Sequence, residues 1–190
     1  MSALISENTN RIERYSLTAI ALHWVMALLI ISLLILGYYM ADLPKGFPNR
    51  ADYFNLHKSL GVLAALLILV RMGWRWTHPV PQLPPTMQGW TVLVARWGHI
   101  MLYFCMVLQP MTGYLSSSFN KYGVKFFGIE LPKWGWEDSE LRDSFMFYHH
   151  LIAVLLVGLI VIHVLAAYKH LLVDHDQVFQ RMLPWGNKND

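Results

Sequence analysis

The stretch FYHHLIAVLLVGLIVIHVLAAYKH, residues 147–170, decides the fold of this chain. It is almost continuously apolar, yet it carries histidines near both ends and one more, His163, within it. At a rise of about 1.5 Å per residue, an α-helix of roughly 20 such residues crosses a hydrocarbon core of about 30 Å. Ionisable or metal-binding side chains are rare inside such a helix and mark functional sites. The stretch therefore predicts a transmembrane helix that carries a functional site.

Three further stretches share this apolar character, and the composition agrees with them. Of the 190 residues, 55% are hydrophobic and 14% are charged, and the mean hydropathy is +0.36. That balance indicates lipid as the solvent. We therefore expect one all-α domain over residues 1–190, a membrane-embedded, up-and-down four-helix bundle that contacts lipid and not nucleic acid. Its helices are predicted at about residues 17–40, 56–76, 95–116 and 147–170.

The basic residues predict how the bundle is oriented. Arg71, Arg75 and Arg96 flank one short connection that contains no acidic residue, whereas the opposite side mixes its lysines with acids. Basic residues near helix ends favour the cytoplasmic side of a membrane. We therefore expect both chain termini on the cytoplasmic side.

Two histidines of the last stretch define the geometry of a site. His149 and His163 are 14 positions apart, which places them about 21 Å apart along a helix axis. Fourteen steps of about 100° end within about 40° of whole turns, so both imidazoles leave the same helix face. One helix therefore offers two nitrogen ligands near opposite sides of the membrane.

Up-and-down threading supplies a partner histidine at each depth. His23 comes level with His163 near the inner side, and His57 comes level with His149 near the outer side. A histidine pair across a bundle interior binds a haem iron from both faces and leaves no open coordination position, which favours electron transfer over oxygen binding. We therefore predict His23 and His163 as ligands of an inner haem iron, and His57 and His149 as ligands of an outer one. A histidine-lined transporter of protons or metal ions would not explain two pairs at two depths.

Gly61 and Arg71 extend this hypothesis to the rest of a haem. Gly61 lies one turn after His57 and leaves space where the edge of a flat porphyrin can approach. Arg71 and Arg75 follow His57 by 14 and 18 positions, at the level of the inner haem, where they can pair with the anionic propionates. The alternative is that Arg71 and Arg75 are only positive anchors at the membrane surface.

Three other histidines have weaker claims to a role. His99, near the inner end of the third stretch, is either a rival ligand at that depth or a hydrogen-bonding core residue. His150 points about 100° away from His149, so only one of the two faces the bundle. His170 lies near the inner surface, where it can carry protons to a quinone.

The longest connection, residues 117–146, is rich in aromatic residues, lysines and acids. It is either a functional cap over one end of the bundle or an aromatic belt at the membrane interface. Both alternatives place it on the outer side.

Several short motifs, in order along the chain, resemble those of the bacterial cytochrome b561 family. They are Tyr15 to His23-Trp24, Leu56-His57 with Gly61, Val70-Arg71 before the proline-rich residues 78–85, Arg96-Trp97-Gly98-His99, Gln109-Pro110-Met111-Thr112-Gly113, and Tyr148-His149 with His163. The resemblance covers nearly the whole chain. Members of this family are four-helix di-haem cytochromes, related to the membrane cytochrome b subunits of hydrogenases and formate dehydrogenases.

The resemblance implies cofactors, partners and a location. It implies two haem b groups held by the two histidine pairs, a quinone such as ubiquinone as an electron partner, and the bacterial inner membrane. Some members are associated with superoxide oxidation coupled to quinone reduction. For that activity the resemblance suggests a basic entrance on the outer side, for which Lys121 and Lys125 are the matching residues.

Two functions are compatible with this pattern. In the first, the chain is an oxidoreductase that passes electrons from an outer-side donor, with superoxide as a candidate, through two haems to the membrane quinone pool. In the second, it is the haem-bearing membrane anchor of a larger dehydrogenase or hydrogenase complex, and a docked subunit is the donor. The helices are the same in both cases, so they do not distinguish the two functions.

Overall fold

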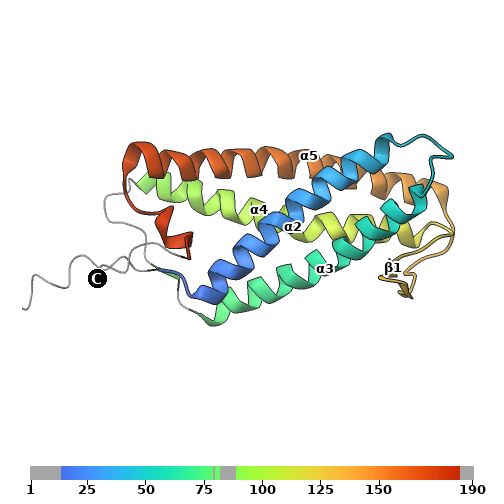
Figure 1. The fold of residues 1–190 in the computed structure, drawn as a ribbon, viewed down its shortest axis with the longest axis horizontal. Coiled ribbons are helices and arrows are strands. Elements are labelled where there is room, and N and C mark those ends of the chain that lie inside the picture. Colours follow the sequence, from blue (N-terminus) through green and yellow to red (C-terminus); the bar gives the residue numbers. More distant parts are fainter. Residues whose placement is uncertain (1–13, 79, 82–88, 185–190) are drawn as a thin grey trace, which may run out of the picture.

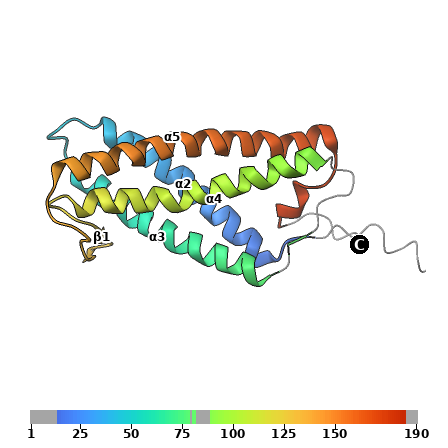
Figure 2. The same cartoon turned by 180° about the vertical axis from the view of Figure 1, so that it is seen from behind.

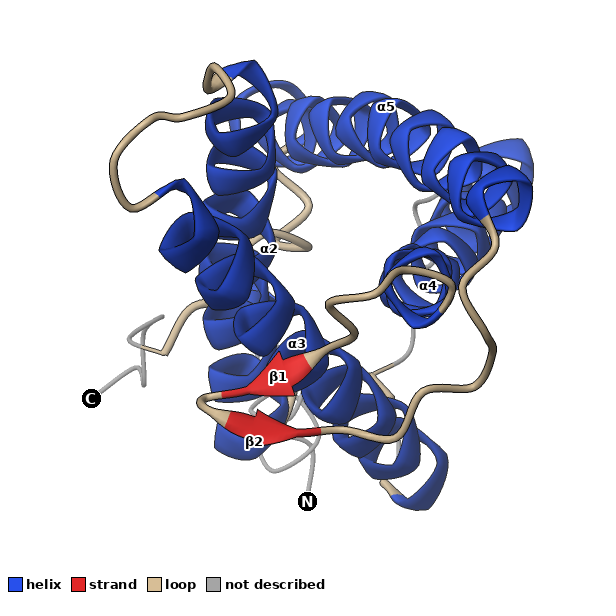
Figure 3. Cartoon of the chain, turned by 90° about the vertical axis from the view of Figure 1, so that its right-hand side faces the viewer, coloured by secondary structure: helices blue, strands red, loops and turns tan. Residues whose placement is uncertain are grey.

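A computed structural model describes the fold for residues 14–78, 80–81 and 89–184. Four long helices run alternately in opposite directions: α2 (Leu17–Asp42), α3 (Arg50–Thr77), α4 (Gly89–Ser118) and α5 (Ser139–Lys169) (Figure 1 and Figure 2). Each of them is long and apolar enough to cross a membrane. Seen along the bundle, the four helices are arranged around a common interior (Figure 3). The prediction of an all-α, up-and-down four-helix bundle is confirmed.

The predicted starts of three helices were too late. Helix α3 begins at residue 50 rather than 56, α4 at 89 rather than 95, and α5 at 139 rather than 147. The prediction followed apolar residues, whereas the first turns of α3 and α5 are polar. Asp138 caps α5, because its carboxylate accepts hydrogen bonds from the backbone N–H groups of Glu140 and Leu141, both at 3.0 Å. These helices therefore extend beyond the apolar stretches that revealed them.

Most of the large apolar side chains face outward. A small core joins α4 and α5 around Cys105, Ile152 and Leu156. In contrast, Leu28 on α2 is 66% exposed and Val154 on α5 is 71% exposed, and many similar side chains share this exposure. So much apolar surface is unfavourable in water, and lipid is the solvent that suits it.

The connection between α4 and α5 carries a small antiparallel hairpin, formed by β1 (Lys125–Phe126) and β2 (Ile129–Glu130). Two residues of α3 hold this connection in place. The Lys58 ammonium donates to the carbonyl of Gly123 at 2.7 Å, and the Ser59 hydroxyl donates to the carbonyl of Lys125 at 3.0 Å. The connection is therefore held against α3, and we call this end of the bundle the hairpin end (Figure 3).

The opposite end of the bundle holds the start of α2 and the end of α5 (Figure 1). Helix α5 continues as a π-helical turn, η1 (His170–Asp174), which is followed by a short 3-10 helix, η2 (Gln180–Met182). The carbonyl of Met182 accepts a hydrogen bond from the indole N–H of Trp24 at 2.8 Å. The segment after α5 therefore folds back onto α2. We call this end the termini end.

Candidate functional site

Two histidines lie next to each other at the hairpin end, His57 on α3 and His149 on α5. Their ring centroids are 6.3 Å apart and their ring planes meet at 84°. Two imidazoles that bind one metal ion from opposite sides, each with a metal–nitrogen bond of about 2 Å, have ring centroids roughly 6 Å apart. The angle between the planes is free in that arrangement, because both planes contain the ligand axis. The pair therefore has the spacing of two axial ligands.

An apolar cavity adjoins this pair. It contains about 480 Å³ of empty space, part of it open to the outside. All four helices contribute to its lining, for example through Leu33 of α2, Ile68 of α3, Met106 of α4 and Leu156 of α5. Gly61 also lines the cavity, and a Cβ atom at this position would meet nothing within 4 Å. Gly61 thus borders open space beside the histidine pair, and the approach of a porphyrin edge to it stays a prediction.

Gln109 on α4 fixes the orientation of the His149 ring. Nδ1 of His149 lies 2.9 Å from the backbone carbonyl of Gln109, which can only accept, so this nitrogen carries the proton. Nε2 is then left with a lone pair, and the side-chain amide of Gln109 donates to it at 3.2 Å. A backbone carbonyl on one ring nitrogen is the usual way in which a protein prepares the other nitrogen for a metal.

Two glycines allow the histidine rings to pack closely against neighbouring helices. A Cβ atom at Gly113 on α4 would lie 2.9 Å from Cε1 of His149, and one at Gly37 on α2 would lie 3.0 Å from Cε1 of His57. Sequence reasoning did not assign these residues to the site. Gln109 and Gly113 stood within a motif of the family resemblance, whereas Gly37 gave no signal beyond being a small residue in an apolar helix.

Three histidines gather toward the termini end. The ring centroids of His23 on α2 and His163 on α5 are 6.3 Å apart, with the ring planes at 65°. The ring of His99 on α4 lies 5.4 Å from that of His163. Nδ1 of His99 also lies 2.8 Å from the carbonyl of Ala95, the same kind of contact that His149 makes with Gln109, so it does not separate a ligand from a core residue. His23 and His163 have the same separation as the pair at the hairpin end, and the choice between His23 and His99 as the partner of His163 stays a prediction.

Arg71 reaches this cluster from α3. Its guanidinium donates to the carbonyl of Ala19 at 3.0 Å and to the hydroxyl of Tyr103 at 3.1 Å, and it lies 3.3 Å from Nδ1 of His23. Arg71 is therefore adjacent to the predicted inner ligand. Its pairing with a haem propionate stays a prediction.

The remaining predicted residues lie near the two ends of the bundle. His150 is exposed, whereas His149 is half-buried beside His57. His170 is largely buried, and its Nδ1 lies 2.6 Å from a carboxylate oxygen of Asp176. The two predicted entrance lysines lie at the hairpin end. Lys121 is exposed, and Lys125 forms an ion pair of 3.1 Å with Glu130, which the sequence did not predict.

The comparison with known proteins agrees with this geometry. The sequence profile of the family described as "Prokaryotic cytochrome b561" matches residues 14–185. The chain belongs to the prokaryotic cytochrome b561 family. This cytochrome b561 is therefore an electron-transfer protein of a bacterial membrane, and its family implies haem b as the cofactor.

The relatives of this cytochrome b561 match it over almost their whole lengths. It is 32% identical to cytochrome b561 homolog 2 of Escherichia coli (strain K12) over 178 residues, which cover 92% of this chain and 94% of the relative. It is 27% identical to the probable superoxide oxidase CybB of Yersinia pestis over 175 residues, which cover 90% and 97%. It is 25% identical to cytochrome b561 homolog 1 of Escherichia coli (strain K12) over 176 residues, which cover 90% and 98%.

The residues at the hairpin end fit a haem b. Nδ1 of His57 is buried and makes no hydrogen bond in the part of the chain that the structure describes, so this ring has not found a partner within the protein. The adjoining cavity is lined almost entirely by apolar groups, which suits a macrocycle. His57 and His149 are the residues that would hold the group there. The backbone carbonyl of Gln109 keeps Nε2 of His149 unprotonated, and the side-chain amide of Gln109 would leave that nitrogen when the group binds.

We predict that Gly113→Ala lowers the haem content of this cytochrome b561. The new methyl group would lie 2.9 Å from Cε1 and 3.1 Å from Nδ1 of His149, and the ring can retreat only by losing its hydrogen bond to Gln109. Overpacking of this kind typically costs about 1–3 kcal/mol. The measurement is Soret absorbance per chain, together with the thermal unfolding midpoint. Gly158→Ala on α5 is the control, because its Cβ atom would meet nothing within 4 Å; equal haem loss in both variants would contradict the account.

Proposed function

We propose that this cytochrome b561 holds two haems b, one between His57 and His149 and the other between His23 and His163, and passes electrons between an outer-side donor and the membrane quinone pool. The observation that carries the proposal is the 6.3 Å ring separation shared by the two pairs. Helix α5 supplies one ligand to each pair, and its two histidines are about 21 Å apart along the axis. Haem b, when bound, supplies a one-electron carrier at each depth, and two axial histidines favour electron transfer over oxygen binding.

Arg71 is the residue that would support the haem nearer the termini end. A guanidinium only donates hydrogen bonds, so its contact with Nδ1 of His23 leaves the proton of that ring on Nε2. A histidine that binds iron through Nε2 carries its proton on Nδ1 instead. Ligation by His23 would therefore release Arg71 from the ring and free its guanidinium for a propionate.

The termini end is the side that we assign to the cytoplasm and to quinone reduction. Arg71, Arg75 and Arg96 lie toward this end, as the positive-inside rule requires of a cytoplasmic face of the bacterial inner membrane. Quinone reduction also needs protons. The carboxylate of Asp176 holds Nδ1 of His170, which leaves Nε2 of this ring able to give and take a proton. We therefore assign His170 as a proton carrier for a quinone such as ubiquinone.

Superoxide is the donor that we propose at the hairpin end. The name of the Yersinia pestis relative, probable superoxide oxidase CybB, favours it. Lys121 is exposed there, Lys125 shares its charge with Glu130, and the ammonium of Lys58 lies beneath the connection on the carbonyl of Gly123. Ammonium groups close to the point of entry attract an anion and raise its rate of encounter.

We predict that the four histidines act as two pairs. His23→Ala and His163→Ala should remove one haem, and His57→Ala and His149→Ala should remove the other, because each pair shares one iron. Redox titration of the purified variants by visible absorption checks this. The two variants of one pair should show the same single redox transition, and the two variants of the other pair should show the other transition.

His150→Ala is the matched control, because His150 neighbours His149 but is exposed, and it should keep both haems. A His163→Ala variant that titrates like His57→Ala would refute the pairing. Loss of a haem in His99→Ala, with both haems kept in His23→Ala, would instead assign His99 as the ligand.

We also predict that reversing charge at the hairpin end slows the reaction with superoxide. The double variant Lys121→Glu, Lys125→Glu should reduce its haems with superoxide about tenfold more slowly or worse, because the anion is no longer attracted. Reduction by a neutral reagent should be unchanged, and the wild-type superoxide rate should fall as salt rises. Stopped-flow absorption measures both rates. Lys45→Glu, on the exposed connection between α2 and α3, is the control for net charge at this end; an unchanged superoxide rate in the double variant would favour a haem-bearing anchor fed by a docked subunit.

A further inference from the structure

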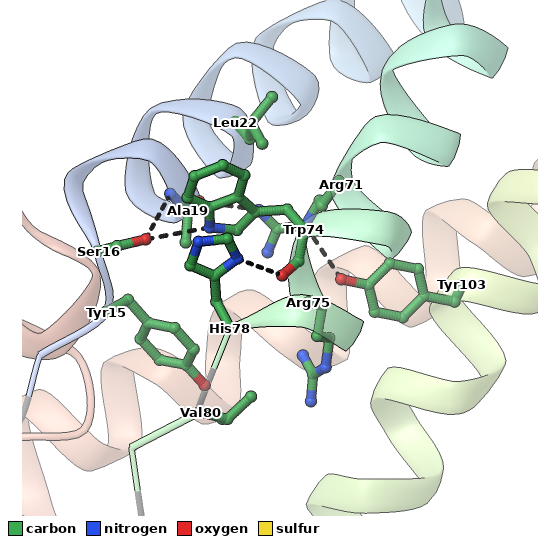
Figure 4. Close-up of a pocket in the computed structure, with 10 residues that line it drawn as sticks. All are labelled: Tyr15, Ser16, Ala19, Leu22, Arg71, Trp74, Arg75, His78, Val80 and Tyr103. Atoms are coloured by element: carbon green, nitrogen blue, oxygen red, sulfur yellow. Dashed lines mark hydrogen bonds between the residues drawn. The ribbon is translucent and has the colours of Figure 1, made fainter.

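A second pocket lies at the termini end, between α2, α3 and α4. It contains about 390 Å³ of empty space and is partly open to the outside. Arg71, Trp74 and Arg75 of α3 line it, together with Tyr15 and with Tyr103 of α4 (Figure 4). None of the histidines proposed as haem ligands is among its lining residues, whereas His57 and His149 line the apolar cavity near the hairpin end. The pocket shares Arg71 with the proposed inner haem site, whereas Trp74, Arg75 and Tyr15 have no role in the proposed electron transfer.

The charge of the pocket is positive and is not balanced by the protein. Arg71 and Arg75 are one helical turn apart, so both project from the same side of α3. All the partners of Arg71 are neutral groups, and the guanidinium of Arg75 lies 5.8 Å from the ring centre of Tyr103. Within the described residues neither arginine forms an ion pair with a carboxylate. Because Arg71 is the residue proposed for a haem propionate, the guanidinium of Arg75 is the charge that stays unbalanced at the edge of the bundle, and it favours an anionic ligand.

The walls of the pocket are aromatic and fixed in place. The indole of Trp74 donates to the hydroxyl of Ser16 at 3.1 Å, and its ring stacks on that of His78 with centroids 3.7 Å apart and planes at 9° (Figure 4). Tryptophan and tyrosine are the residues that gather at the level of lipid headgroups. The pocket also lies where α3 ends, which is the depth at which a transmembrane helix leaves the hydrocarbon. Its position therefore matches that of a headgroup phosphate.

We propose that this pocket binds the phosphate of an anionic phospholipid, with Arg75 as its main contact. Arg75 is exposed, whereas Arg71 is half-buried and contacts His23. A guanidinium matches a phosphate with two parallel hydrogen bonds, and basic pockets between helices on the cytoplasmic side of membranes bind anionic headgroups. A neutral quinone would leave the charge of Arg75 unbalanced. Free phosphate shares the chemistry of the headgroup, so the experiment separates these two sources.

The experiment uses the purified haem-loaded protein in a neutral detergent. Phosphatidylglycerol is titrated in, with phosphatidylcholine as the zwitterionic comparison, and the thermal unfolding midpoint is measured at each concentration. We expect phosphatidylglycerol alone to raise the midpoint, and Arg75→Gln to need an about fivefold higher concentration for the same shift. Arg96→Gln removes an exposed arginine of α4 that does not line the pocket, and it should respond like wild type. Arg75→Lys keeps the charge without the two-pronged geometry and should be intermediate.

Titration with inorganic phosphate identifies the source of the phosphate, and the Arg75→Gln variant tests the specificity of the site. Inorganic phosphate that gives no shift at millimolar concentration identifies the lipid as the ligand, whereas a phosphate shift that Arg75→Gln abolishes identifies free phosphate and overturns the lipid proposal. Equal phosphatidylglycerol responses in wild type and Arg75→Gln would also overturn it. Loss of haem in Arg75→Gln would overturn it as well, because the pocket would then belong to a propionate. None of these readings depends on quinone or superoxide turnover, so the proposed function can fail while this site stands.

Discussion

A histidine within a membrane-spanning helix needs a partner for its ring nitrogens, because hydrocarbon offers none. Helix α5 carries two such histidines that face other helices, His149 and His163. Each lies beside a histidine of another helix, His57 on α3 and His23 on α2. At the hairpin end, Gln109 satisfies His149, while Nδ1 of His57 is left without a hydrogen bond in the described chain. The glycines against these rings, the cavity beside them and the weak core elsewhere are consistent with a bundle shaped around a ligand that binds two imidazoles.

The two ends of the bundle differ, and the proposed direction of electron transfer depends on that difference. At the hairpin end, Lys58 and Ser59 of α3 hold the connection, and lysines lie in it and beneath it. The termini end gathers arginines, the pair of His170 with Asp176, and a basic pocket with aromatic walls. An anionic donor suits the first end, and the cytoplasmic face of a membrane suits the second. In this account direction comes from the loops and helix ends, whereas the two histidine pairs in the helix interiors share a ring separation of 6.3 Å.

Sequence alone predicted the four spans, because each depends on the composition of one helix. The 14-residue spacing of His149 and His163, with up-and-down threading, also indicated which histidines come level with them. The starts of α3 and α5 were placed too late, because polar first turns such as the one capped by Asp138 carry no apolar signal. Gly37 was missed because close packing of a ring from another helix leaves no periodic trace in the sequence. The ion pair between Lys125 and Glu130 depends on the register of a two-residue hairpin, which composition does not reveal.

The central claim is that one chain holds two haems b between its two histidine pairs. The most direct measurement is the ratio of haem b to polypeptide in the purified protein, with haem determined as the pyridine haemochromogen and protein by amino-acid analysis. The account predicts a ratio near two for wild type and near one for His57→Ala. A wild-type ratio near one would contradict it, and the 6.3 Å separation of the second pair would then be a packing contact rather than an iron site.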